Sequence, residues 1–247
     1  MQRFKFKGKN IVAMIPARMG STRLAMKNMA LISGKPLIYY PIQAAKESGV
    51  FTRIVVNSED TLFQKIAKRY GAEFYKRPKR WATSKAKSDR VVYDFLKENP
   101  CDIIAWVNPT SPLQGAKEIR DVVTYFVKSG LDSLITVKNE QVHCLHKGRP
   151  INFKIDTIFS RTQDLVPVQP FVYSIMIWRR DLFMKTFERN GHAFFCGRFG
   201  TYPVSKLSAV IVKSRTDLMM VQSLIKGLKR GAGLSVRYDR ILSKNRA

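Results

Sequence analysis

Cysteine and histidine are scarce in this chain of 247 residues, with three of each. The cysteines have no CxxC spacing, and the histidines do not complete a zinc signature with them. We therefore assign no metal site to these residues and expect reduced thiols, as in a cytoplasmic protein. The residues are Cys101, Cys144, Cys196, His143, His146 and His192.

Long apolar runs are also missing. No stretch approaches the roughly 18 apolar residues that a membrane-spanning helix needs, and the opening MQRFKFKGKN is basic without the apolar core of a signal peptide. We expect neither membrane insertion nor secretion, and hence a cytoplasmic location.

Acidic residues are few. The chain has 18 Asp and Glu against 44 Lys and Arg, which gives a net charge of +26. Such an excess attracts anionic substrates or polyanions. The basic residues are spread along the chain without a recognised nucleic-acid-binding motif, so association with nucleic acid is the weaker interpretation.

Short β-branched apolar runs alternate with helical patterns. We expect strands at 10–15, 53–58, 102–107, 132–137 and 207–212, and helices at 35–49, 59–71, 88–99, 116–130 and 214–231. Alternation of this kind predicts a three-layer, doubly wound α/β fold around a mainly parallel sheet. We expect one domain over 1–247, interrupted by a β-rich insertion at 139–178.

The loop IPARMGSTRLAMKN, residues 15–28, follows the first predicted strand. In open α/β sheets, ligands bind beyond the carboxyl ends of the strands. The loop matches neither the Walker nor the dinucleotide motif, yet its residue types suit a triphosphate. Gly20 permits close backbone approach, Ser21 and Thr22 offer hydroxyl donors, and three cations offset charge, namely Arg18, Arg23 and Lys27. The alternative is a solvated basic loop that binds nothing.

The same loop carries a family resemblance. It resembles the IPAR-G-G-S-K-G-L-P-G-K-N opening of the acylneuraminate cytidylyltransferases, and it is followed by GKPLI and VNSED in the family's order. The likeness continues through KRP at 76–78, VNPTSPLQ at 107–114, DSLITV at 132–137 and RTQDLVPV at 161–168. The chain thus looks like a divergent member of that family, and the resemblance implies an α/β fold of the nucleotide-diphospho-sugar transferase type.

The resemblance implies transfer of CMP from CTP to an acidic 2-keto sugar with release of pyrophosphate, normally helped by Mg²⁺. It assigns nucleotide contacts to the loop, with Lys27 facing the leaving pyrophosphate. The nucleotide-binding residues are Arg18, Gly20, Ser21, Arg23, Lys27, Asn28 and Arg77.

For the sugar, the resemblance implies Asn108, Thr110 and Ser111 at the end of the third strand, with Arg161 and Gln163 approaching from a neighbouring subunit. The insertion at 139–178 would then be a dimerisation arm, and the protein a homodimer. An arginine fork suits a carboxylate.

The chain departs from the family at the magnesium site. Where the family has Asp-Ile-Asp, this sequence places Ile211 and Lys213 at the two aspartate positions, and neither side chain is a ligand for a hard divalent cation. Three interpretations stay open. Lys213 itself acts as the catalytic cation, Mg²⁺ travels on CTP alone, or the protein binds nucleotide or sugar without turnover.

Overall fold

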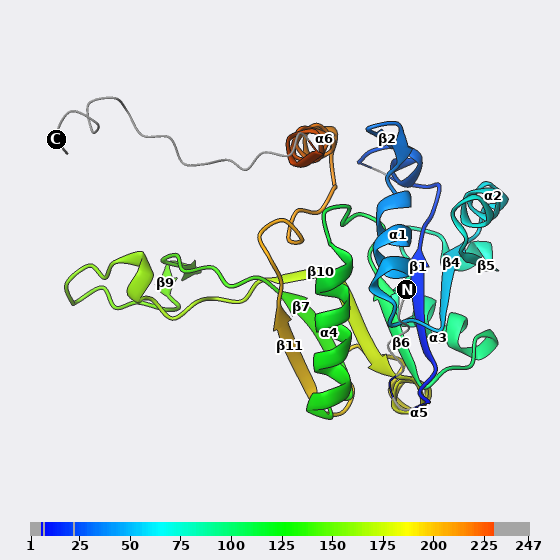
Figure 1. The fold of residues 1–247 in the computed structure, drawn as a ribbon. Coiled ribbons are helices and arrows are strands. Elements are labelled where there is room, and N and C mark those ends of the chain that lie inside the picture. The colour runs from blue at the N-terminus through cyan, green and yellow to red at the C-terminus, as the bar shows by residue number, and fades with distance from the viewer. Residues whose placement is uncertain (1–5, 7, 22, 230–247) are drawn as a thin grey trace.

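The computed structural model describes residues 6, 8–21 and 23–229. A seven-stranded sheet lies at the centre, in the order β11-β7-β10-β6-β1-β4-β5 (Figure 1). Every neighbouring pair is parallel except those of β10, which runs antiparallel to β6 and β7. The strands are β1 (Ile11–Pro16), β4 (Arg53–Ser58), β5 (Glu73–Lys76), β6 (Ile103–Val107), β7 (Ser133–Val137), β10 (Phe171–Arg179) and β11 (Phe199–Pro203).

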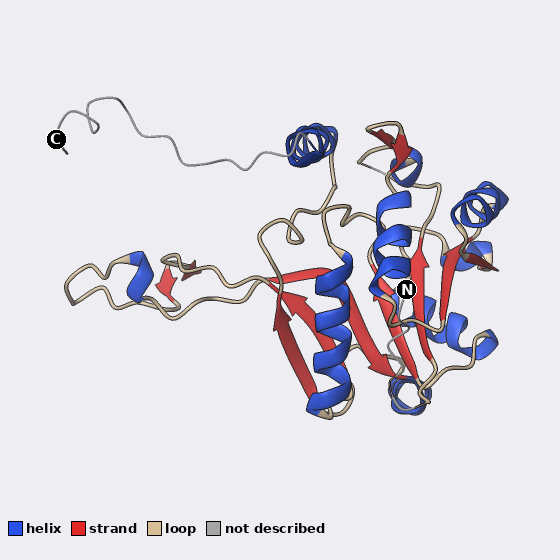
Figure 2. Cartoon of the chain, in the orientation of Figure 1, coloured by secondary structure: helices blue, strands red, loops and turns tan. Residues whose placement is uncertain are grey.

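Helices cover both faces of this sheet (Figure 2). Alternate residues of β1 point to opposite faces, so Ala13 packs with α1, α2 and α4, whereas Met14 packs with α3 and α5. The fold is therefore the three-layer, mainly parallel α/β sandwich that the sequence predicts. The helices are α1 (Tyr39–Ser48), α2 (Thr61–Tyr70), α3 (Ser88–Glu98), α4 (Ala116–Ser129), α5 (Arg180–Asn190) and α6 (Arg215–Lys229).

Short elements complete the chain. The start of the predicted helix 35–49 belongs instead to a small hairpin, because α1 begins only at Tyr39. No side chain caps the start of α3, and the Asp89 carboxylate in its first turn accepts hydrogen bonds from Ala193 N and Phe194 N. The short elements are β2 (Leu31–Ile32), β3 (Lys35–Pro36), β8 (Leu145–His146), β9 (Arg149–Pro150), and the 3₁₀ turns η1 (Lys27–Met29), η2 (Lys79–Trp81) and η3 (Thr162–Asp164).

The predicted insertion divides into two parts. Residues 139–170 form an arm that projects from the body (Figure 1), held at its base by a hydrogen bond from Lys138 N to Pro170 O of 3.1 Å. Residues 171–178, which we expected in the insertion, are a central strand instead. PFVYSIMIW is apolar on both sides of its second half, as a strand buried between two helical layers requires.

The predicted strand at 207–212 is also wrong. The chain makes a turn there and then runs in extended form to α6, because the backbone of Val212 bonds outside the sheet. Val212 is buried against the β2–β3 hairpin and α6. Ser214 is the N-cap of α6: its Oγ accepts from Asp217 N at 3.2 Å, while its own N–H donates to the Asp217 carboxylate at 2.8 Å.

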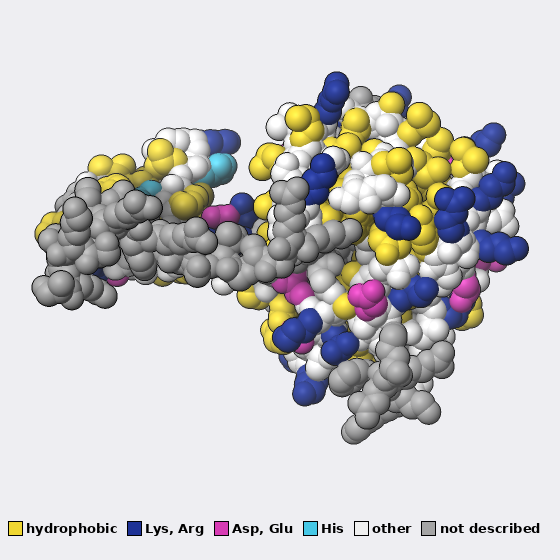
Figure 3. Space-filling model, turned by 45° about the horizontal axis from the view of Figure 1, so that its top comes forward, with side chains coloured by type: hydrophobic (Ala, Val, Ile, Leu, Met, Phe, Trp, Pro, Cys, Tyr) yellow, Lys and Arg dark blue, Asp and Glu magenta, His cyan; other side chains and the backbone are white. Residues whose placement is uncertain are grey.

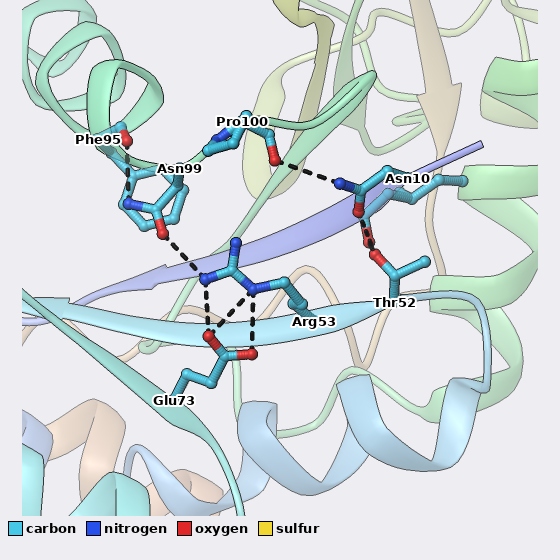
Figure 4. Close-up of polar contacts among 8 residues, drawn as sticks. Asn10, Thr52, Arg53, Glu73, Phe95, Asn99 and Pro100 are labelled. Carbon is cyan, nitrogen blue, oxygen red and sulfur yellow. Dashed lines mark hydrogen bonds and ion pairs between the residues drawn. The ribbon is translucent and has the colours of Figure 1, made fainter.

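A polar network joins the strands at their amino ends (Figure 4). Arg53 of β4 donates two bonds of 3.0 and 2.7 Å to one oxygen of Glu73 in β5, and a further one of 3.2 Å to Asn99 beyond α3. Asn10 donates to Pro100 O at 3.2 Å and accepts from Thr52. These bonds tie the edge of the sheet that lies away from the predicted nucleotide loop.

Among the residues that the structure describes, no helix is both long enough and apolar enough to cross a membrane.

Candidate active site

A cavity of about 280 Å³ opens at the carboxyl ends of β1 and β6. Five segments form its wall, namely the loop after β1, η1, the segment after β5, the start of α3 and the turn after β6. Of the residues singled out in the sequence, seven line it: Arg18, Ser21, Lys27, Asn28, Arg77, Asn108 and Thr110.

Lys27 lies at the edge of this cavity. Its ammonium donates to Val212 O at 2.9 Å, and its pKa is lowered by burial first, then by the charges of Arg23, Arg18 and Lys213. The carboxylate of Asp217 acts in the opposite direction. Four cations therefore surround this corner of the site, an arrangement suited to a polyphosphate.

The connector before α6 is fastened across the edge of the cavity. Val212 N–H donates to Thr110 O at 2.9 Å, and Val212 O accepts from Lys27. Because both bonding partners line the cavity, the adjacent Lys213 is held beside the phosphate loop although its sequence position is far away. Its side chain is exposed.

Arg77 supports the loop after β1 through a hydrogen bond and an ion pair. Its guanidinium donates to Ala17 O at 2.6 Å and pairs with Glu59 at 3.1 Å. Glu59 in turn accepts the N–H of Met19 at 2.9 Å. This buried network fixes the first residues of the loop, and it lowers the pKa of Arg77 through desolvation, which outweighs the opposing effect of Glu59.

Several buried polar atoms at this edge have no hydrogen-bond partner among the described residues. They are Asn28 Oδ1, Arg77 Nε, Trp106 Nε1 and Ser111 Oγ. An unpaired buried donor or acceptor costs about 1 to 3 kcal/mol, so such atoms are expected where a ligand supplies the missing bonds. Three of the four belong to residues that line the cavity, the exception being Ser111.

Asn108 lines the cavity, but its carboxamide already has partners. Its Oδ1 accepts from the N–H of Thr110 at 3.0 Å and from the Thr110 hydroxyl at 2.8 Å, and its Nδ2 donates to Tyr173 O at 3.1 Å. Tyr173 lies at an irregularity of β10 with φ of 59°. Within this chain Asn108 therefore shapes the turn, and its second amide hydrogen is what remains for a ligand.

The remaining sequence candidates lie around or away from the cavity. Arg23 is exposed, and it lies near enough for its charge to lower the pKa of Lys27. A Cβ added at Gly20 would meet no atom of the described residues within 4 Å, so no close contact among them requires a glycine there. Arg161 and Gln163 lie on the exposed arm, where Arg161 pairs with Asp164 at 2.8 Å. This chain does not bring them to its own cavity, and Thr22 is outside the described residues.

The residues present do not fit a protein-held Mg²⁺. Among the described residues no three His, Cys, Asp or Glu side chains form a group that could hold a metal. Near the phosphate loop stands Asp217, which already accepts from Lys213 N, Ser214 N and Ser214 Oγ. Ile211 and Lys213 supply no oxygen ligand.

Sequence reasoning missed part of the wall. Trp106 of β6 lies two residues before Asn108, which directly follows the strand, and both residues line the cavity, so this spacing was the available signal. Glu59 directly follows β4 and shares its edge with the phosphate loop. The segment from η2 to α3 contributes further wall residues, namely Trp81, Thr83, Ser84, Ala86 and Ser88.

Comparison with known proteins agrees with this geometry. The chain is 28% identical over 221 residues to an N-acylneuraminate cytidylyltransferase of Streptococcus agalactiae serotype III, an alignment that covers 85% of this chain and 52% of that protein. It is 37% identical over 119 residues to the CMP-N,N'-diacetyllegionaminic acid synthase of Legionella pneumophila, covering 46% and 51%. The chain thus spans about half the length of these relatives.

Among solved structures, the fold matches a CMP:2-keto-3-deoxy-manno-octonic acid synthetase complexed with CTP. The TM-score is 0.68 at 14% sequence identity, over 88% of this chain and 99% of that one. Residues 12–155, more than half of the sequence, match the family described as Cytidylyltransferase, and the chain belongs to that family.

Proposed function

We propose that the protein transfers CMP from CTP to an acidic 2-keto sugar of the nonulosonate kind and releases pyrophosphate. The observation that carries this proposal is the cluster of Arg18, Arg23, Lys27 and Lys213 beside a cavity at the carboxyl edge of the sheet. The names of the two curated relatives, which concern acylneuraminate and legionaminate, support an acidic sugar as acceptor.

In the proposed reaction the anomeric hydroxyl oxygen of the sugar attacks the α-phosphorus of CTP. The new oxygen–phosphorus bond forms as the bond to the β-phosphate bridge breaks, and the hydroxyl proton passes to water. Arg18 and Lys27 neutralise charge that builds on the leaving pyrophosphate. Asn28 and Arg77 present unpartnered polar atoms for the nucleotide, and no step uses a metal held by the protein.

The acceptor end of the site is proposed to be completed by a second copy of the chain. The arm exposes a series of large apolar side chains, Leu145, Ile151, Ile155, Ile158, Phe159 and Val166. Burial of these residues in a homodimer would carry Arg161 and Gln163 to the partner's cavity, where a guanidinium fork would bind the sugar carboxylate. We further propose that the protein acts in the cytoplasm.

The test is CTP titration by calorimetry, followed by pyrophosphate release with a panel of 2-keto sugar acids. We expect CTP binding, and turnover with at least one acid of the panel. Lys35→Ala provides a matched control for Lys27→Ala, since Lys35 is a nearby exposed lysine that does not line the cavity. Absence of CTP binding would refute the proposal.

A second function, nucleotide binding without turnover, is favoured by the unsuitable metal positions. CTP binding with no pyrophosphate release from any acid, in the dimer, would select it. Association with nucleic acid, suggested by the net charge of +26, predicts RNA or DNA binding that weakens steeply with salt.

A further inference from the structure

The corner of the site that faces the phosphates is positively charged before any ligand arrives. Three cations lie near enough to Lys27 to lower its pKa, namely Arg18, Arg23 and Lys213. The carboxylate of Asp217 acts in the opposite direction. A divalent cation approaching this corner would be repelled by the net positive charge. A triphosphate, by contrast, is attracted.

The one carboxylate in this corner is already engaged. Asp217 accepts two backbone N–H bonds of 2.8 Å, from Lys213 and Ser214, and a hydroxyl bond of 2.9 Å from Ser214. These bonds cap α6 and lower the pKa of Asp217. Protein sites for Mg²⁺ usually provide one or two carboxylates together with substrate phosphates. Here the first carboxylate stabilises a helix end, and its neighbour is a lysine.

The backbone fixes where Lys213 stands. Val212 is buried and bonds through both its N–H and its carbonyl, to Thr110 and to Lys27. The peptide after Val212 donates from Lys213 N to Asp217. The backbone of Lys213 is thus anchored on both sides, while its side chain is exposed next to the phosphate loop.

We propose that this protein binds CTP as the metal-free polyanion, with the ammonium of Lys213 in the place where a divalent cation would otherwise neutralise the triphosphate. This inference rests on the proposed function and deepens it. Because Mg²⁺ cancels part of the nucleotide charge before binding, the magnesium complex gains less from the four cations than free CTP does. The site therefore selects free CTP.

The experiment measures CTP affinity by calorimetry on the full chain, once in EDTA and once in millimolar MgCl₂. We expect binding in EDTA to be at least as tight as with Mg²⁺, and pyrophosphate release to persist in EDTA. Lys213→Met removes the charge while keeping a long side chain, and should weaken CTP binding in EDTA about tenfold or more.

Lys213→Asp sharpens the test because it places a second carboxylate beside Asp217. This variant should bind CTP weakly in EDTA and recover when Mg²⁺ or Mn²⁺ is added. Lys226→Asp, on the exposed surface of α6, makes the same charge change and should behave as the unmodified protein does in both buffers. Thermal melting checks that all three variants are folded.

CTP binding that occurs only with Mg²⁺ would overturn this inference and leave the proposed function standing. Unchanged affinity in Lys213→Met would overturn it in the same way. Failure of CTP to bind in either buffer would overturn the proposed function, and this inference with it.

Discussion

The two ends of the parallel strands treat polar side chains in opposite ways. At the amino ends, Arg53, Glu73 and Asn99 satisfy one another, and Asn10 bonds to Thr52 and Pro100 (Figure 4). At the carboxyl ends, four cations lie in one cluster with Asp217, and several buried polar atoms lack hydrogen-bond partners among the described residues. The comparison therefore distinguishes groups that satisfy one another within the fold from groups that are available to a ligand.

The surface continues this contrast. Figure 3 turns the top of the molecule in Figure 1 toward the viewer, and Lys and Arg side chains are spread over the visible face while Asp and Glu are few. A field of one sign speeds the arrival of an anionic substrate and is weakened by salt. The excess of positive side chains at the carboxyl edge therefore favours the approach of a negatively charged ligand.

The largest effect on stability is expected from the ion pair of Arg77 and Glu59, which supports the loop after β1 at the cavity. Arg77→Met leaves the Glu59 carboxylate without its cationic partner, in a pair whose Arg77 side chain is 4% exposed and whose Glu59 side chain is 14% exposed. Urea unfolding should show a loss of about 3 to 5 kcal/mol. The double variant Arg77→Met with Glu59→Leu should recover much of it; a single-variant loss below about 1 kcal/mol would contradict the role assigned to the pair.

Next in size, Lys27→Ala should weaken CTP binding about tenfold or more, because a charge-assisted phosphate contact contributes about 1.5 to 3 kcal/mol. The midpoint of urea unfolding should change much less than in Arg77→Met. Calorimetry on this variant and on Lys35→Ala measures the difference. Equal affinities in the two variants would remove Lys27 from the nucleotide site.

The pH dependence of CTP binding gives a smaller, graded effect. Burial and the neighbouring cations lower the pKa of Lys27, so it loses its proton at a pH where an ordinary lysine is still charged. CTP affinity should therefore fall as pH rises through that lowered pKa, whereas stability should rise, since the unfolded chain holds this proton more tightly. Titration over alkaline pH in Lys27→Arg should show no such fall in affinity; a fall of the same size there would assign it to another group.

The smallest effect is expected at the amino edge. Arg53→Ala removes a half-exposed ion pair with Glu73 and should cost at most about 1 kcal/mol in urea unfolding. CTP affinity should be unchanged, because the network lies at the far end of the strands from the cavity. A clear loss of CTP binding would contradict this expectation, because it would mean that the amino edge also affects the nucleotide site.

Much of the fold follows from local patterns. The runs at 53–58 and 102–107 are strands because continuous β-branched apolar residues suit a sheet that is covered on both faces. Gly49 and Gly71 end α1 and α2 with φ of 70° and 71°, as their positions predict. The loop after β1 was singled out in the same way, by its place after a buried strand, and residues of it line the cavity.

What the sequence could not supply is set by long-range contacts. The segment LSAVIV at 207–212 has strand composition, yet Val212 bonds to Thr110 and Lys27, which lie far away in the chain. The local sequence pattern of this segment does not identify those distant partners. Trp106 was assigned only to a strand for the same reason, since its role depends on which segments meet at the cavity. The positions of Arg161 and Gln163 relative to a cavity stay a prediction that requires a second copy.

The base of the arm has a consequence for how such a protein changes over evolutionary time. The two ends of the arm lie beside Lys138 and Pro170, at neighbouring antiparallel strands, and a backbone hydrogen bond joins these two residues. Lengthening or shortening the excursion between them leaves every strand where it is and adds only a small closure entropy. The arm can thus change in length and sequence independently of the segments that line the cavity.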